Sequence, residues 1–238
     1  MTRMQWSIWF LAATGKFFEG LVVFMTGVTL PLIVAEFGLD ATQKGMISAA
    51  PLAGILIGAT VLGGLADTFG RKRMFIVEMV IFTIFLIALT LITDYVWALI
   101  FLFGVGVALG CDYPTAHLVI SESISSRNRG KLVLSAFGFQ ALGALVGTMV
   151  GYLILANNPD VSAWRWMYAT AIIPAALVTI GRFYITDSSH WLLAHGRVAE
   201  AELELERLLD RAPTYPKRVR LVDPGASLDA DGGCPRHS

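Results

Sequence analysis

A few ionisable side chains interrupt the long apolar stretches of this sequence, and they are its first candidates for chemistry. Lys16 and Glu19 lie three residues apart in one such stretch, and Asp112 lies in another, directly before Tyr113 and Pro114. A charged group removed from water is costly, so such residues usually face a cavity or a partner and mark a path for ions or solutes. A carboxylate there can take up and release a proton, and an ammonium can attract an anionic group.

Each of these residues also has a purely structural explanation. Lys16 and Glu19 can form an ion pair along one helix that simply neutralises both charges. Pro114 removes a backbone donor, so Asp112 can bond the loosened backbone while Tyr113 packs against lipid. The sequence leaves both explanations open, and we favour the functional one for Asp112.

Glu78 and Gln140 are further polar residues within apolar stretches. Glu78 can reach the membrane interface, pair with an arginine of the neighbouring loop, or take part in proton coupling. Gln140 has an amide that can donate or accept a hydrogen bond across a cavity, or can join neighbouring helices. We place Glu78 with the proton-coupling candidates, and Gln140 and Lys16 with the solute-binding ones.

The composition indicates a membrane protein and excludes several other classes. Hydrophobic residues make up 55% of the 238 residues and charged residues 15%, and the mean hydropathy is +0.66. The formal net charge is zero, which argues against a nucleic-acid partner. Cys111 and Cys234 are the only cysteines, so no disulfide framework, metal site or cofactor is expected.

Six stretches are long and apolar enough to cross a bilayer. A helical span needs about 20 mostly apolar residues, and these stretches are too long, and lack the alternation, for barrel strands. The sequence therefore predicts an all-α integral membrane fold, with a six-helix bundle over residues 1–186. The predicted spans are residues 6–32, 46–66, 74–92, 95–120, 132–155 and 164–184.

Lysines and arginines gather in alternate short loops of the predicted bundle. Because cytoplasmic loops are enriched in basic residues, this pattern predicts that both termini are cytoplasmic. The basic residues of the second and fourth loops are Arg71, Lys72, Arg73, Arg127, Arg129 and Lys131, against only Lys44 and Arg165 in the first, third and fifth.

The chain becomes polar after the sixth stretch. Residues 189–195 and 198–210 have the pattern of short amphipathic helices, so we expect a cytoplasmic helical segment over 187–211. Residues 212–238 are rich in Pro, Gly and Asp and are expected to be disordered. Within the spans, small residues recur at four-residue spacing at 50–58 and 143–151, which predicts closely packed helices.

Residues 63–73, GGLADTFGRKR, match the loop pattern GxxxDxxGRK of the major facilitator superfamily. The motif falls in a loop that the basic residues assign to the cytoplasm. Residues 110–131, 164–174 and 190–197 resemble the sugar-porter and the metabolite- or phosphate-proton symporter branches of that superfamily. The chain is identified as resembling the N-terminal half of such a transporter, which implies a bundle of three plus three helices in an inverted repeat and no enzymatic activity.

The resemblance also implies roles for particular residues. Relatives place an acidic residue near Glu19 and another at Glu78, and their GDYP motif supplies a proton-carrying carboxylate at Asp112 and a substrate hydroxyl at Tyr113. They carry a substrate-binding glutamine at Gln140. A cytoplasmic gate of charge pairs and loop glycines is implied as well. Its residues are Gly63, Asp67, Gly70, Arg71, Glu122 and Arg129.

The expected function is symport of a small hydrophilic solute, such as a sugar, an organic acid or phosphate, with protons across the plasma (inner) membrane. Two features depart from the family pattern: Ile100 stands where many relatives carry arginine, and residues 186–192 read TDSSHWL instead of PESPRWL. Alternating access needs two bundles that rock about one site. The alternative is therefore a truncated, non-transporting half, or a membrane partner that needs a second half or a second copy of itself.

Overall fold

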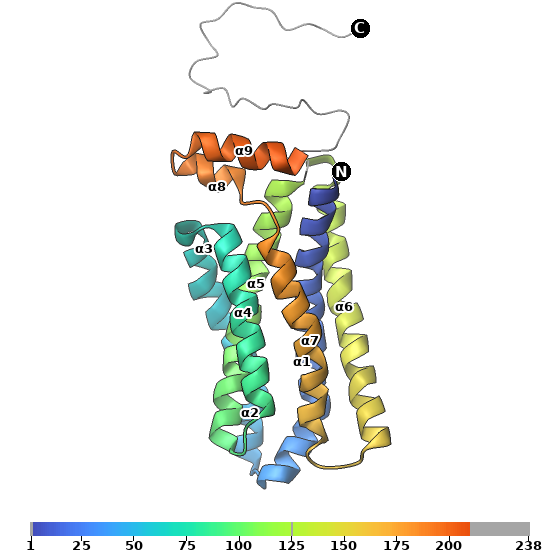
Figure 1. The fold of residues 1–238 in the computed structure, drawn as a ribbon. Coiled ribbons are helices and arrows are strands. Elements are labelled where there is room, and N and C mark those ends of the chain that lie inside the picture. The colour runs from blue at the N-terminus through green and yellow to red at the C-terminus, as the bar shows by residue number, and fades with distance from the viewer. Residues whose placement is uncertain (1, 125, 210–238) are drawn as a thin grey trace, which may run out of the picture.

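The computed structural model describes residues 2–124 and 126–209 of the chain, without the side chains of residue 67 and residues 126–129. Every regular element assigned in those ranges is helical, and the long helices run side by side in one bundle (Figure 1). The predicted tail of residues 212–238 lies outside the described residues.

Six helical spans in these ranges are long and apolar enough to cross a membrane, so the predicted all-α membrane fold is confirmed. The second span, Ala41–Ala66, consists of α2 (Ala41–Ile57), a π-helical turn η1 (Gly58–Leu62) and the first part of α3 (Gly63–Phe69). The remaining spans lie in α1 (Arg3–Phe37), α4 (Arg71–Thr90), α5 (Tyr95–Ser123), α6 (Ser126–Asn157) and α7 (Ala163–Phe183).

Local capping fixes where the first two helices begin. The Thr2 hydroxyl accepts a hydrogen bond from the backbone N–H of Gln5, and the Gln5 side chain accepts one from the backbone N–H of Thr2. Asp40 and Gln43 form the same reciprocal pair at the start of α2. Between α3 and α4, Gly70 has a φ of 96°, which favours glycine, so the chain turns sharply there.

Glycines allow two pairs of helices to approach closely, α1 with α6 and α2 with α5. A Cβ on Gly143 would lie 2.0 Å from the carbonyl oxygen of Phe17, and a Cβ on Gly54 would lie 2.2 Å from that of Phe103. Such distances are too short for any side chain. Both glycines belong to the predicted rows of small residues, and close helix packing is confirmed at these two positions.

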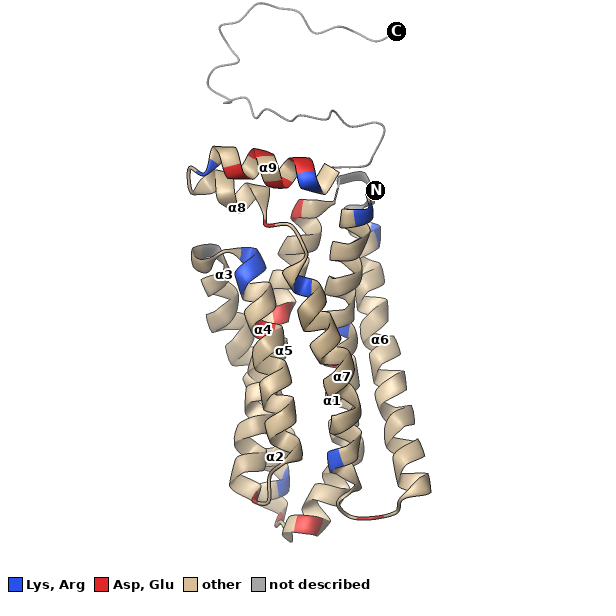
Figure 2. Ribbon diagram, in the orientation of Figure 1, with Lys and Arg blue, Asp and Glu red and all other residues tan. Residues whose placement is uncertain are grey.

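Apolar side chains cover much of the outer surface of the bundle. Leu56, Leu134 and Ile173 are 67%, 73% and 72% exposed, respectively. An apolar surface of this kind suits contact with lipid chains. Most charged residues lie toward the two ends of the bundle, with few between them (Figure 2).

Two short helices, α8 (Ser189–Ala194) and α9 (Val198–Leu209), lie across the end of the bundle where α1 begins (Figure 1). The first ends one residue earlier than predicted, and residue 210, the predicted end of the second, lies outside the described residues. The Thr2 hydroxyl donates to the Leu208 carbonyl at 2.7 Å, and the Gln5 amide donates to the Ser123 carbonyl at 2.9 Å. These bonds join the start of α1 to α9 and to the end of α5.

Candidate functional site

Five ionisable side chains from four helices meet in the interior of the bundle, and we call them the buried charge cluster. Each is at most 5% exposed. Burying a charge is tolerated only where it is paired or hydrogen-bonded, so the contacts within this cluster decide what it can do. Its members are Lys16 and Glu19 from α1, Glu78 from α4, Asp112 from α5 and Arg182 from α7.

Arg182 joins three helices through its guanidinium. Nη1 donates to Glu78 Oε1 and to the Phe75 carbonyl, both at 2.6 Å, and Nη2 donates to Asp112 Oδ1 at 2.8 Å. The guanidinium carbon also lies 3.5 Å from the centre of the Phe75 ring. The planar fork of an arginine suits this role, because it can hold two carboxylates in fixed directions.

Lys16 continues the cluster on the α1 side. Its Nζ lies 3.1 Å from Glu19 Oε2, 3.9 Å from Asp112 Oδ2 and 3.4 Å from the centre of the Tyr113 ring. The Gln140 amide donates to Glu19 Oε1 at 3.1 Å. The ion pair within α1 is therefore present, but it is not isolated, because both of its members contact other helices.

Gly15 lets the backbone of α1 lie against the Asp112–Arg182 ion pair. A Cβ on Gly15 would lie 2.5 Å from Asp112 Oδ1 and 2.6 Å from Arg182 Nη2. On the far side of the cluster, the Thr115 hydroxyl donates to Glu78 Oε2 at 2.7 Å. The positions of the carboxylates are thus fixed from α1, α5 and α7 together.

The charges of the cluster do not balance. Two cations, Lys16 and Arg182, face three carboxylates, so the fully ionised cluster has one negative charge in excess. Uncompensated charge in a low-dielectric interior is costly, and one bound proton would remove it. Among the described residues, Asp112 Oδ2 has no hydrogen-bond donor, which leaves that oxygen open to a proton or a ligand.

The structure brings together all six predicted proton-coupling and solute-binding residues. The structural explanation has Asp112 bonding the backbone that Pro114 loosens. In the structure, the Asp112 carboxylate pairs with Arg182 instead. Glu78 neither reaches the interface nor pairs with a loop arginine, because it is 2% exposed and also bonds Arg182. Tyr113 and Gln140 are half-buried at the edge of the cluster.

Arg182 is absent from the predicted site although it is the residue that connects the cluster. It lies within the predicted span 164–184, so the rule that singled out the other charged residues also applies to it. Its position near the end of that span is compatible with an ordinary interfacial arginine, which hides its role. Thr115 and Gly15 carry no sequence signal of this kind.

Three neighbouring aromatic side chains, Tyr113, His117 and Phe137, lie near Lys16. The ring centroids of Tyr113 and Phe137 are 6.3 Å apart, and those of His117 and Phe137 are 5.2 Å apart. A small cavity is bordered by Lys16, His117 and Phe137. At about 10 Å³ this cavity has room for about one water molecule, so in the described arrangement it is too small for a solute.

Two predicted gate residues, Arg71 and Glu122, meet where α4 begins and α5 ends. Arg71 forms an ion pair with Glu122, and the Ser188 hydroxyl donates to the same Glu122 carboxylate. Ser188 lies just before α8, so this contact joins α8 to both spans. Ser188 was not predicted as a gate residue.

Close packing favours glycine at position 63, whereas at position 70 it is the φ of 96° that favours glycine. A Cβ on Gly63 would lie 2.6 Å from the Pro114 ring, and one on Gly70 would lie 3.5 Å from the Trp191 ring of α8. The side chains of Asp67 and Arg129 lie outside the described residues, so their predicted pairings stay predictions.

The bundle matches the fold of a known membrane transporter. The proton:xylose symporter XylE of E. coli, a major facilitator superfamily protein, superposes with a TM-score of 0.79 at 23% sequence identity. The match covers 86% of this chain and 50% of XylE. The match shows that the chain has the fold of about half of that transporter.

Curated relatives found by sequence are transport proteins as well. The putative metabolite transport protein YaaU of Escherichia coli (strain K12) is 32% identical over 88% of this chain and 47% of its own length. The galactose-proton symporter of the same strain is 30% identical over 87% of this chain and 44% of its own length. The chain therefore spans about half the length of the curated relatives it matches.

The family itself is shown by a model that matches residues 8–224, described as sugar (and other) transporter. The chain belongs to this family. Together with the six apolar spans, the family makes it a multi-pass protein of the inner membrane. The relatives named here are transporters, and the comparisons do not support the alternative of a partnership with a separate second half.

Proposed function

We propose that the chain forms the proton-coupling part of a symporter that moves a small hydrophilic solute, such as a sugar, an organic acid or phosphate, by alternating access. The observation that carries this proposal is the excess negative charge of the buried charge cluster, which one proton would neutralise. The relatives named as proton symporters of galactose and xylose support it.

In this proposal Asp112 and Glu19 exchange the proton. Asp112 has an open oxygen, Oδ2, and Glu19 contacts Lys16 and the half-buried Gln140 at the edge of the cluster. Glu78 and Asp112 both pair with the Arg182 guanidinium. A proton on either carboxylate therefore changes the negative charge that faces this guanidinium. Glu78 is therefore a third proton acceptor of the same cluster.

Solute binding follows from the same contacts. The Lys16 ammonium lies near the carboxylates of Glu19 and Asp112. When either carboxylate takes up a proton, it attracts the ammonium less, so Lys16 can attract an electronegative or anionic group of the solute. The Tyr113 hydroxyl and the Gln140 amide can complete the hydrogen bonds. Proton and solute are then linked, because each binding event favours the other.

The gate closes the end of the bundle where α4 begins. Arg71, Glu122 and Ser188 hold α4, α5 and the segment before α8 together in the described arrangement. Breaking these contacts biases the transporter toward a state that is open at this end. The basic residues of the second and fourth loops assign both termini, and this end of the bundle, to the cytoplasm. The gate is therefore the cytoplasmic gate.

The test is uptake into energised membrane vesicles across a panel of sugars, organic acids and phosphate, with and without a proton uncoupler. Accumulation that the uncoupler abolishes is expected, and Asp112→Asn and Glu19→Gln should each reduce it at least about a hundredfold. Asp94→Asn, at an exposed loop carboxylate, is the matched control and should transport normally. Uptake that is insensitive to the uncoupler, with both variants active, would rule out proton coupling.

A further inference from the structure

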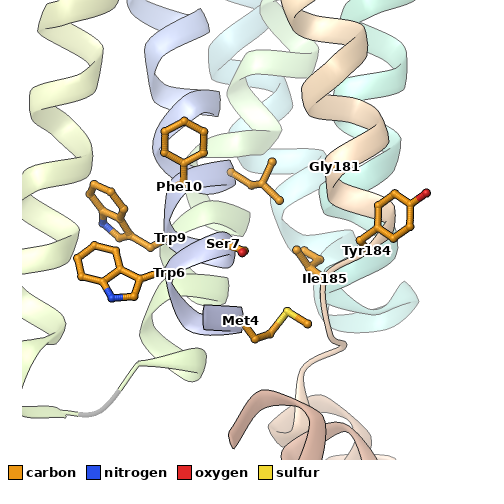
Figure 3. A pocket seen from close by; sticks show the side chains of 9 residues that line it. Met4, Trp6, Ser7, Trp9, Phe10, Gly181, Tyr184 and Ile185 are labelled. Carbon is orange, nitrogen blue, oxygen red and sulfur yellow. The ribbon is translucent and has the colours of Figure 1, made fainter. Parts of the chain in front are cut away.

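An apolar groove of about 610 Å³ runs between α1 and the end of α7. Figure 3 shows aromatic side chains of α1, among them Trp6 and Phe10, on one side and Tyr184 on the other. Gly181 lets α7 approach α1 closely at one edge of the groove, since a Cβ there would lie 2.9 Å from the Leu11 side chain. We call this feature the α1–α7 groove.

A second pocket, of about 580 Å³, continues the groove. The two share Met4, Ser7, Tyr184 and Ile185 among their lining residues. We call the second one the basic pocket, because α1, α4 and α9 each contribute a cation to it. These cations are Arg3, Lys72 and Arg207.

The basic pocket keeps a positive excess. One carboxylate, Glu204, also lines it, so three cations face one anion and the difference is two positive charges. Glu204 is already engaged, since it accepts from Arg207 Nη1 at 3.0 Å and from the Asp187 backbone N–H at 3.3 Å. Neither Arg3 nor Lys72 forms an ion pair with any described side chain.

We propose that the α1–α7 groove and the basic pocket together bind one anionic phospholipid. Its phosphate would lie among Arg3, Lys72 and Arg207, and one acyl chain would fill the α1–α7 groove. Aromatic side chains such as Trp6 and Tyr184 belong at the level of lipid headgroups, and basic pockets between spanning helices suit anionic ones. The charge excess selects an anionic lipid over a zwitterionic one with the same chains.

The position of the site gives the lipid a structural effect. Its headgroup would contact α1, α4 and α9 at once, next to the gate, because Lys72 directly follows Arg71 in the chain. Bound lipid would therefore hold α9 against the spans. This proposal does not depend on transport activity, and its test measures binding alone.

Tryptophan fluorescence gives a local readout, since Trp6 and Trp9 line the groove. The full chain in detergent micelles is titrated with phosphatidylglycerol or phosphatidylcholine that carry identical brominated acyl chains, which quench nearby indoles. We expect phosphatidylglycerol to quench at lower concentration than phosphatidylcholine. Trp6→Phe should reduce the difference between the two lipids, because it removes one of the two indoles in the groove.

Two neighbouring basic residues provide a matched pair of variants. Lys72→Gln should raise the phosphatidylglycerol concentration for half-maximal quenching roughly fivefold, the effect of losing one basic residue near an anionic headgroup. Arg73→Gln removes the same charge at an exposed position that does not line the pocket, so it should change little. Phosphatidylcholine quenching checks the fold, because a misfolded variant would change that curve as well.

Three results would overturn the proposal. Equal quenching by the two lipids would mean an ordinary layer of lipid around the helices. Equal effects of the two variants would mean a diffuse attraction of charge. Displacement of phosphatidylglycerol by inorganic phosphate at equal concentration would mean a site for a soluble anion, not for a lipid.

Discussion

The buried charge cluster and the gate are both built from ion pairs, but they differ in balance and in contact with water. In the buried charge cluster, Arg182 is fully buried and faces two carboxylates, and the total charge is negative. In the gate, the Arg71 and Glu122 side chains are each 15% exposed and carry opposite single charges. The first arrangement is strained by an excess charge, and the second is neutral.

This difference in charge balance and exposure indicates different roles for the buried charge cluster and the gate. A buried, unbalanced cluster is expensive to break but responds to a single proton. A balanced and partly exposed pair at the edge of the bundle costs less to break than the buried cluster, so it can open and close more easily. One region is suited to sensing a proton, and the other to switching between conformations.

The largest expected effect is that of Arg182→Met. The change leaves Glu78 and Asp112 buried without their counter-ion, which should lower the free energy of unfolding by about 3–5 kcal/mol. Thermal unfolding of the purified chain in detergent measures the loss. A protein as stable as the original would mean that the cluster is hydrated and that its contrast with the gate is false.

A compensated variant separates charge from packing in the same experiment. In the triple variant Arg182→Met, Glu78→Gln and Asp112→Asn, no uncompensated charge remains around position 182. Most of the lost stability should return, since replacing a whole buried ion network by neutral groups is often close to neutral in free energy. If the triple variant stays as unstable as Arg182→Met alone, the guanidinium acts through its packing on Phe75 instead.

A smaller effect is expected from Gly15→Ala. The new methyl group would press on Asp112 and Arg182, so stability should fall by about 1–3 kcal/mol. Gly27→Ala in the same helix is the control, because nothing lies within 4 Å of its Cβ, and it should be neutral or slightly stabilising. Equal outcomes for the two variants would show that α1 does not fix the ion pair.

The fold could be predicted from the sequence because each span shows itself by length and apolar content alone. The errors lie at the helix ends, where tertiary partners decide. The first span is predicted to end at residue 32, but α1 continues to Phe37, and Glu36 near its end is bonded by Trp164 at 2.5 Å and by Arg165 at 2.6 Å. Such distant partners give no local signal.

The site was predicted as a set of residues but not as a set of contacts. Charged residues are rare in apolar stretches, so Glu19, Glu78 and Asp112 can each be recognised as a candidate from the sequence. Their partners depend on how α7 is rotated toward α4 and α5, which spacing along one helix does not fix. Arg182 could have been found by the same rule, whereas Thr115 is an ordinary residue until its neighbours are known.

The smallest expected effect on stability is that of Arg71→Gln, which opens the gate. Because the pair with Glu122 is partly exposed, the global free energy of unfolding should change by no more than about 1 kcal/mol. The local effect should be clearer: the amides of α8 lose their anchor through Glu122 and Ser188, so their hydrogen exchange should quicken by roughly fivefold while that of the buried spans stays unchanged. Arg73→Gln, an exposed neighbour, should leave α8 as it was. Exchange that rises throughout the bundle would place the gate within the stable core and would remove its difference from the buried charge cluster.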